Sequence, residues 1–136
     1  MDLYAENILD HYRNPRGKLG VGGWGLGLVI HREDNPACGD ELTVGLTVHD
    51  DHIQHIHWNG TGCAISQAAM SMLSEELEGK TFEDVDHLMK DGMLALLGVP
   101  IGPRRLKCAL LGLHAVKNAL LRFQKTPLRS WSETVA

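Results

Sequence analysis

Residues 42–48 have the sequence Leu-Thr-Val-Gly-Leu-Thr-Val, in which apolar residues alternate with polar or small ones without interruption. Successive side chains of a β-strand point to opposite faces, so this alternation predicts a strand with one buried face. Asp50-Asp51 provides a turn, and residues 52–58 predict the returning strand of a hairpin. Because Ile53 is out of phase with the apolar residues that follow it, we expect a β-bulge in this second strand.

Upstream of the hairpin, residues 3–13 predict a helix that ends at Asn14-Pro15, since proline disfavours the helical conformation in the residue before it. The glycine-rich residues 17–27 predict a loop. Alternating apolar residues over 26–30 predict a short strand, and residues 35–39, Asn-Pro-Ala-Cys-Gly, have the composition of a turn.

Downstream of the hairpin, the apolar pattern predicts a helix over residues 64–78 that ends at Gly79. Thr81 is a suitable N-cap for a second helix over residues 82–90, and residues 93–97 predict a short helical turn.

The last long helix is expected to begin at Pro103, which suits a first helical position, and to run to about Phe123. Residues 126–136 predict a polar, frayed tail, so we place the domain at residues 1–125. Strands and helices occupy separate parts of the chain, which predicts an α+β fold with helices packed on one face of a small antiparallel sheet.

Composition narrows the class of protein. The 136 residues suit one domain, and a formal net charge of -4 gives no basic stripe of the kind that nucleic acid selects. No stretch is apolar for long enough to span a bilayer, and Met1–Tyr12 carries three acidic residues instead of the basic start of a secretory signal. We therefore expect a cytoplasmic protein with reduced cysteines that acts on neither nucleic acid nor membrane.

The three cysteines are an odd number, which does not suit a disulfide framework, and all fall at breaks or ends of predicted elements. Cys38 lies in the turn, Cys63 where a strand gives way to a helix, and Cys108 near the start of the last helix. Unpaired backbone N–H groups at a helix start stabilise a thiolate, and the basic residues before Cys108 add to this effect.

Asp40 follows Cys38 across a glycine, so its carboxylate can face the same point. Three thiolates and a carboxylate, Cys38, Asp40, Cys63 and Cys108, would complete a tetrahedral zinc site or hold a small iron–sulfur cluster. Because carboxylate is a hard, weakly held partner for a soft centre, such a site is expected to be labile. Burial of the cysteines as small apolar side chains stays open as the alternative, since no Cys-x-x-Cys pair is present.

Four motifs add a resemblance to a known family. They are residues 10–16 (Asp-His-Tyr-Arg-Asn-Pro-Arg), 35–40 (Asn-Pro-Ala-Cys-Gly-Asp), 62–66 (Gly-Cys-Ala-Ile-Ser) and 107–109 (Lys-Cys-Ala). Together they resemble the IscU, SufU and NifU N-terminal family of iron–sulfur scaffold proteins, over roughly residues 3 to 124. The resemblance implies an α+β fold with a three-stranded antiparallel sheet.

The subtype is indicated by three features. Lys107 before the last cysteine resembles SufU, whereas IscU-like members carry a histidine there. The segment from Cys63 to Cys108 is too short for the insertion that SufU-like members typically carry, and residues 101–105 match the IscU chaperone-binding motif Leu-Pro-Pro-Val-Lys poorly. We therefore expect a SufU-like variant without the insertion.

The resemblance implies a non-enzymatic scaffold that accepts sulfur from a cysteine desulfurase and passes a labile cluster, of the 2Fe–2S type, to apo iron–sulfur recipient proteins. Cys108 is the first candidate for the sulfur acceptor and Cys38 the second, with Lys107 as a stabiliser of the Cys108 thiolate. One alternative is a zinc-dependent sulfurtransferase that activates the desulfurase. Another is structural zinc in an interaction domain.

Four histidines are expected to have roles outside the predicted metal site. His52, His55 and His57 cluster on one predicted strand and are expected to face solvent, although two of them share a face and could bind a metal. His11 is expected to serve helix packing or a side-chain hydrogen bond.

Overall fold

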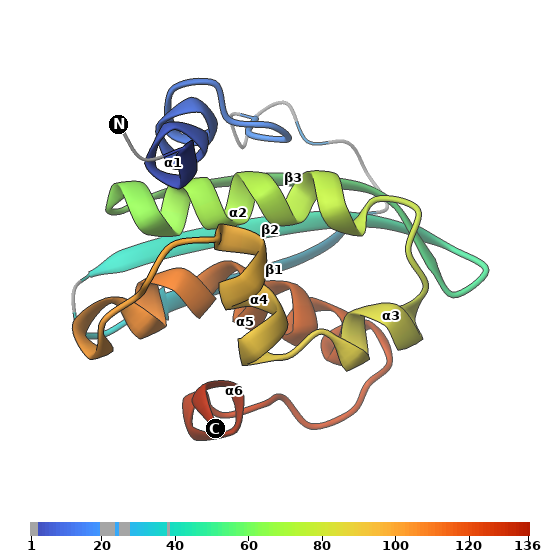
Figure 1. Ribbon diagram of the computed structural model, residues 1–136. Coiled ribbons are helices and arrows are strands. Elements are labelled where there is room, and N and C mark those ends of the chain that lie inside the picture. The colour runs from blue at the N-terminus through green and yellow to red at the C-terminus, as the bar shows by residue number, and fades with distance from the viewer. Residues whose placement is uncertain (1–2, 20–23, 25–27, 38) are drawn as a thin grey trace.

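A three-stranded antiparallel sheet with the order β1-β2-β3 forms the centre of the molecule (Figure 1). The computed structural model describes residues 3–19, 24, 28–37 and 39–136. The strands are β1 (Val29–Asn35), β2 (Asp40–His49) and β3 (His52–Thr61). The predicted α+β class and the three-stranded sheet are therefore confirmed.

The hairpin of β2 and β3 matches the alternation in the sequence. Leu42, Val44 and Leu46 of β2 are fully buried, as one face of a strand covered by helices should be. The β-bulge is confirmed as well, because Thr47 pairs with His55 while Val48 pairs with Ile53. The extra residue in β3 shifts the phase of Ile53, which brings its side chain into the core.

Helices α2 and α5 pack against the sheet, and α1 packs against α2 (Figure 1). The helical segments are α1 (Leu3–Arg13), α2 (Ala64–Leu77), α3 (Phe82–His87), α4 (Lys90–Leu97), the 3-10 turn η2 (Pro103–Arg105), α5 (Leu106–Phe123) and α6 (Trp131–Val135). His11 is buried and its Nδ1 lies 2.7 Å from Ser71 Oγ, so the side-chain hydrogen bond expected of it is confirmed, and this bond joins α1 to α2.

Two strand boundaries differ from the prediction. The returning strand expected over residues 52–58 continues to Thr61, and Gly60 pairs with Leu42 inside it, where a Cβ would lie 2.2 Å from the Glu41 carbonyl oxygen. Glycine at this position thus permits close approach of two strands. The short strand expected over residues 26–30 is in fact β1, which begins at Val29 and continues to Asn35, while residues 26 and 27 lie outside the described part of the chain.

The helices also differ from the prediction in four places. The helix after Thr81 ends at His87 instead of residue 90, and the expected turn at 93–97 is the longer helix α4. Pro103 opens a 3-10 turn, and α5 itself begins at Leu106. The tail expected to fray contains α6, which a capping box of Ser130 and Glu133 begins.

Within the described residues, no helix combines the length and the apolar character that crossing a membrane requires.

Candidate metal centre

The starts of three elements meet at one edge of the molecule, on the left in Figure 1. Asp40 is the first residue of β2, Cys63 is the N-cap of α2, and Cys108 lies in the first turn of α5. One carboxylate oxygen of Asp40 and the two sulfur atoms all lie within 4.8 Å of one another. Three side chains that are far apart in the sequence thus converge on one point.

Burial of the ligand side chains favours a bound cation at this point. Asp40 and Cys108 expose only 6% and 4% of their surface, whereas Cys63 is half-buried. Asp40 Oδ2 is buried and has no hydrogen-bond partner among the residues that the structure describes. A buried carboxylate oxygen without a partner is costly, and a bound metal ion removes that cost.

Gly62 lets the carboxylate enter the site. A Cβ on residue 62 would lie 2.7 Å from Asp40 Cγ and 2.6 Å from Ser66 Oγ, both closer than a side chain tolerates. Gly39, with φ at +76°, completes the tight connection in which its N–H donates to the Asn35 carbonyl oxygen at 2.9 Å. Two glycines therefore position Asp40 against the cysteines.

Helix geometry supplies positive potential at the same point. Neither Cys63, the N-cap of α2, nor Arg105, the N-cap of α5, makes a side-chain hydrogen bond to its helix. The first N–H groups of α2 therefore favour negative charge near them, whereas the N–H of Leu106, the first residue of α5, donates to the Pro103 carbonyl oxygen of the preceding 3-10 turn. This arrangement suits thiolate and carboxylate ligands.

Two polar neighbours of the sulfur atoms were not anticipated from the sequence. The Asn35 amide nitrogen donates to Cys108 Sγ at 3.8 Å, and Ser66 Oγ lies 3.9 Å from Cys63 Sγ. Asn35 and Ser66 are 1% and 0% exposed. Ser66 stands three residues after Cys63 in a helix, a spacing that places side chains together and could have identified it. Asn35 ends β1, and only the fold brings it to Cys108.

The other predicted site residues have mixed outcomes. Cys38 lies outside the described residues, so its place beside Asp40 stays a prediction. Lys107 Nζ lies 5.8 Å from the centre of the Trp131 ring, and its effect on Cys108 likewise stays a prediction. His52 and His55 are exposed as expected, whereas His57 is half-buried. In the described part of the chain, these histidines form no cluster with metal-ligand spacing.

The donor set fits a thiophilic metal. A tetrahedral zinc with bonds of about 2.3 Å to sulfur separates its sulfur ligands by about 3.8 Å. The ligand atoms of Asp40, Cys63 and Cys108 come close to that separation, since none of their mutual distances exceeds 4.8 Å. Three ligands leave one position of a tetrahedron for a fourth donor.

Comparison with protein families finds that the family described as the NifU-like N terminal domain matches residues 3–130. Among curated relatives, iron–sulfur cluster assembly scaffold protein IscU 1 of Archaeoglobus fulgidus is 32% identical over 123 residues, which cover 89% of this chain and 76% of the relative. The zinc-dependent sulfurtransferase SufU of Bacillus subtilis is 31% identical over 137 residues, which cover 88% of this chain and 90% of SufU.

Solved structures show the same fold. A NifU-like N-terminal protein from Brucella abortus superposes with a TM-score of 0.70 at 20% identity, covering 92% of this chain and 96% of that one. An iron–sulfur cluster assembly scaffold protein for the SUF system of Fervidobacterium islandicum has a TM-score of 0.63 at 27% identity, covering 82% and 92%.

Proposed function

Since this chain belongs to the family of NifU-like N-terminal domains, which includes iron–sulfur cluster assembly scaffolds, we propose that it assembles a cluster on its four candidate ligands. Sulfur would come from a cysteine desulfurase, and a labile 2Fe–2S cluster would be the cargo passed to apo recipient proteins. The convergence of the ligand atoms of Asp40, Cys63 and Cys108 within 4.8 Å carries the proposal. Cys38 would be the fourth ligand.

Sulfur uptake is a thiol exchange. A thiolate of this chain attacks the outer sulfur of the desulfurase persulfide, a new S–S bond forms, and the desulfurase cysteine leaves as a thiolate. We place Cys108 first as the acceptor and Cys38 second. Because Cys108 is only 4% exposed, the donor sulfur reaches it only after neighbouring atoms move aside.

A second candidate function is zinc-dependent sulfur transfer, in which the protein activates the desulfurase. The Asp40 carboxylate favours it, because Oδ2 is unpartnered among the described residues and one of the two carboxylate oxygens lies within 4.8 Å of both sulfur atoms, a donor set that zinc accepts. Bound zinc would keep the ligating thiols deprotonated. Cys38, Asp40, Cys63 and Cys108 would hold it, and Lys107 would stabilise Cys108 when that thiolate is released to take up sulfur.

Metal analysis of the purified protein and anaerobic reconstitution with iron, sulfide and a reductant test these functions. A visible cluster chromophore that disappears in Cys108→Ser but persists in His55→Ala, a strand residue outside the site, supports the scaffold. Stoichiometric zinc with stimulation of the desulfurase and no cluster supports the sulfurtransferase. Absence of both metal and sulfur uptake contradicts the two proposals together.

The cysteines support a proposal for the cellular setting. Three cysteines that must stay reduced suit the cytoplasm, and we propose that location for the protein.

A further inference from the structure

A second concave site lies against the middle of α5. A cavity of about 340 Å³ opens between α3, α5 and the segment that leads to α6. Lys117, in its wall, stands nine residues after Cys108, so a helical rise of about 13 Å separates it from the candidate metal centre. The wall has an apolar part, formed by Phe82, Val85, Leu120 and Leu121, and a cationic part, formed by Lys117 and Arg129.

Lys117 is a cation that the fold keeps from water. The residue is 5% exposed, and its Nζ donates to the Asp86 carbonyl oxygen at 3.1 Å and to Met89 Sδ, a weak acceptor, at 3.2 Å. Lys117 forms no ion pair with a carboxylate among the described residues. Burial lowers the pKa of Lys117, and the charge of Arg129 lowers it further, against an opposing effect of the Asp86 carboxylate. The ammonium group therefore lacks a strong anionic partner.

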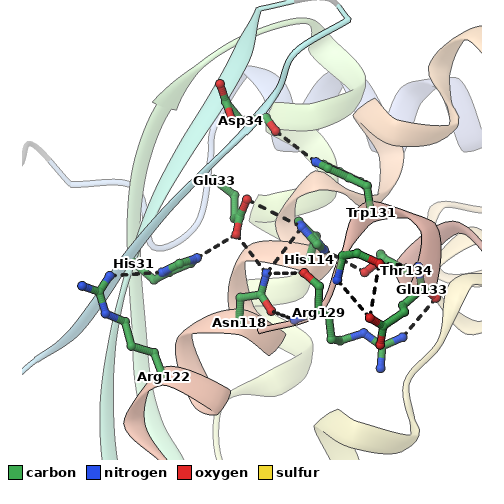
Figure 2. A network of polar contacts seen from close by, with 11 residues as sticks. His31, Glu33, Asp34, His114, Asn118, Arg122, Arg129, Trp131, Glu133 and Thr134 are labelled. Carbon is green, nitrogen blue, oxygen red and sulfur yellow. Dashed lines mark hydrogen bonds and ion pairs between the residues drawn. The ribbon is translucent and has the colours of Figure 1, made fainter. Parts of the chain in front are cut away.

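Arg129 lines the same cavity as Lys117, and one of its N–H groups makes no hydrogen bond within the described residues. Its backbone N–H donates to Asn118 Oδ1 at 2.8 Å, and its Nη2 donates to the Glu133 carbonyl oxygen at 3.1 Å (Figure 2). Arg129 Nε is buried and has no hydrogen-bond partner in the described part of the chain. A fixed guanidinium with a buried, unused N–H is costly without a ligand.

We propose that this cavity binds a small monocarboxylate with an apolar body, whose carboxylate lies between Lys117 and Arg129. The two cations repel each other across the cavity, and an anion between them would relieve that repulsion. The planar guanidinium matches a carboxylate, and Phe82 and Leu120 would cover the apolar body. Glu83 and Asp86 also line the cavity and oppose a dianion, which disfavours phosphate. A volume near 340 Å³ is enough for such a ligand.

Isothermal titration calorimetry with benzoate as the probe tests the site. We expect saturable binding of one benzoate per chain, and binding of neutral benzamide and of inorganic phosphate weaker by about tenfold or more. Lys117→Met and Arg129→Met should each weaken benzoate binding by a similar factor. Lys80→Met, which removes an exposed cation outside the cavity, should leave it unchanged.

The pKa of Lys117 in the unmodified protein provides a second test, which remains possible if Lys117→Met does not fold. Benzoate should raise the pKa of Lys117, seen by NMR of its labelled side chain, because a bound carboxylate favours the charged amine. The proposal is overturned if benzoate does not bind, if benzamide binds equally well, if phosphate binds more tightly, or if Arg129→Met binds benzoate normally. It does not depend on the proposed function, since Cys108→Ser should bind benzoate as the native chain does.

Discussion

The Asp40 carboxylate has one oxygen within 4.8 Å of two sulfur atoms, and its Oδ2 is buried with no hydrogen-bond partner among the described residues. In the metal-free protein this charge costs stability, whereas in the metal-bound protein it is a ligand. We expect Asp40→Asn, which keeps the shape and removes the charge, to raise the free energy of unfolding of the metal-free protein by about 1 kcal/mol. The same change should weaken zinc binding by about tenfold or more, since a carboxylate ligand is lost.

Urea denaturation in the presence of a chelator measures the first effect, and competition against a zinc indicator measures the second. If Asp40→Asn destabilises the metal-free protein, then the buried carboxylate is satisfied in solution and its assignment as a ligand loses its main support.

A side chain at residue 62 should lower the zinc affinity through steric contact alone. A Cβ at residue 62 would displace Asp40 and Ser66, so Gly62→Ala should weaken zinc binding by about tenfold or more without removing any ligand. Gly102→Ala is the matched control, because residue 102 also precedes a helical segment, has φ at -75°, and has no atom within 4 Å of an added Cβ. Equal zinc affinity in both variants would contradict the close approach of Asp40 to residue 62.

At the scale of elements, a buried polar network joins β1 to α5 and α6 (Figure 2). Glu33 Oε1 lies 2.8 Å from His31 Nε2, and the Asn118 amide nitrogen donates to it at 2.9 Å. His114 Nε2 lies 3.6 Å from Glu33 Oε2, and the His114 ring stacks on Trp131 at 4.2 Å. The network fixes the strand that ends beside Cys108 against the helix that carries Cys108.

His114 makes this network sensitive to pH. Burial lowers its pKa, and the charges of His31 and Arg129 act in the same direction, against an opposing effect of Glu33. The unfolded chain therefore takes up a proton near pH 6.5, whereas the folded chain does so only at lower pH. Stability should be intact above pH 6.5, fall as the pH decreases below it, and level off beneath the folded pKa of His114.

The His114→Gln variant, which cannot titrate, tests this expectation by urea denaturation between pH 5 and 8. For one proton the native chain should lose up to about 1.4 kcal/mol per pH unit below pH 6.5 that the variant does not lose. His52→Gln, at an exposed histidine, should retain the native slope. A native slope in His114→Gln would assign the pH dependence to other groups, such as His11, whose pKa burial also lowers.

The same network explains which elements the sequence could predict. The alternation over residues 42–48 identifies β2 because it reports burial against apolar neighbours, which is a local pattern. The polar residues His31 and Glu33 of β1 interrupt such a pattern, because their partners on α5, Arg122 and Asn118, are supplied only by the fold. Motif spacing anticipated Asp40, Cys63 and Cys108, whereas Asn35 required the pairing of β1 with α5.

At the scale of the whole molecule, the candidate centre ties together three distant parts of the chain. Asp40 belongs to the sheet, while Cys63 and Cys108 lie at the starts of the two helices that cover it. The unfolded chain has no such preformed site, so a metal ion that binds here favours the folded state. Zinc at about a hundred times its dissociation constant should therefore add ~2.7 kcal/mol to the free energy of unfolding.

Urea denaturation with and without zinc measures this stabilisation, and the control is Cys63→Ser. The variant retains Asp40 and Cys108 but loses one thiolate, so zinc should shift its midpoint by much less than it shifts the native midpoint. His55→Ala, on the outer part of β3, should respond to zinc as the native chain does. If zinc stabilises Cys63→Ser and the native protein equally, the ion binds elsewhere, and the convergence of these three elements is a matter of packing alone.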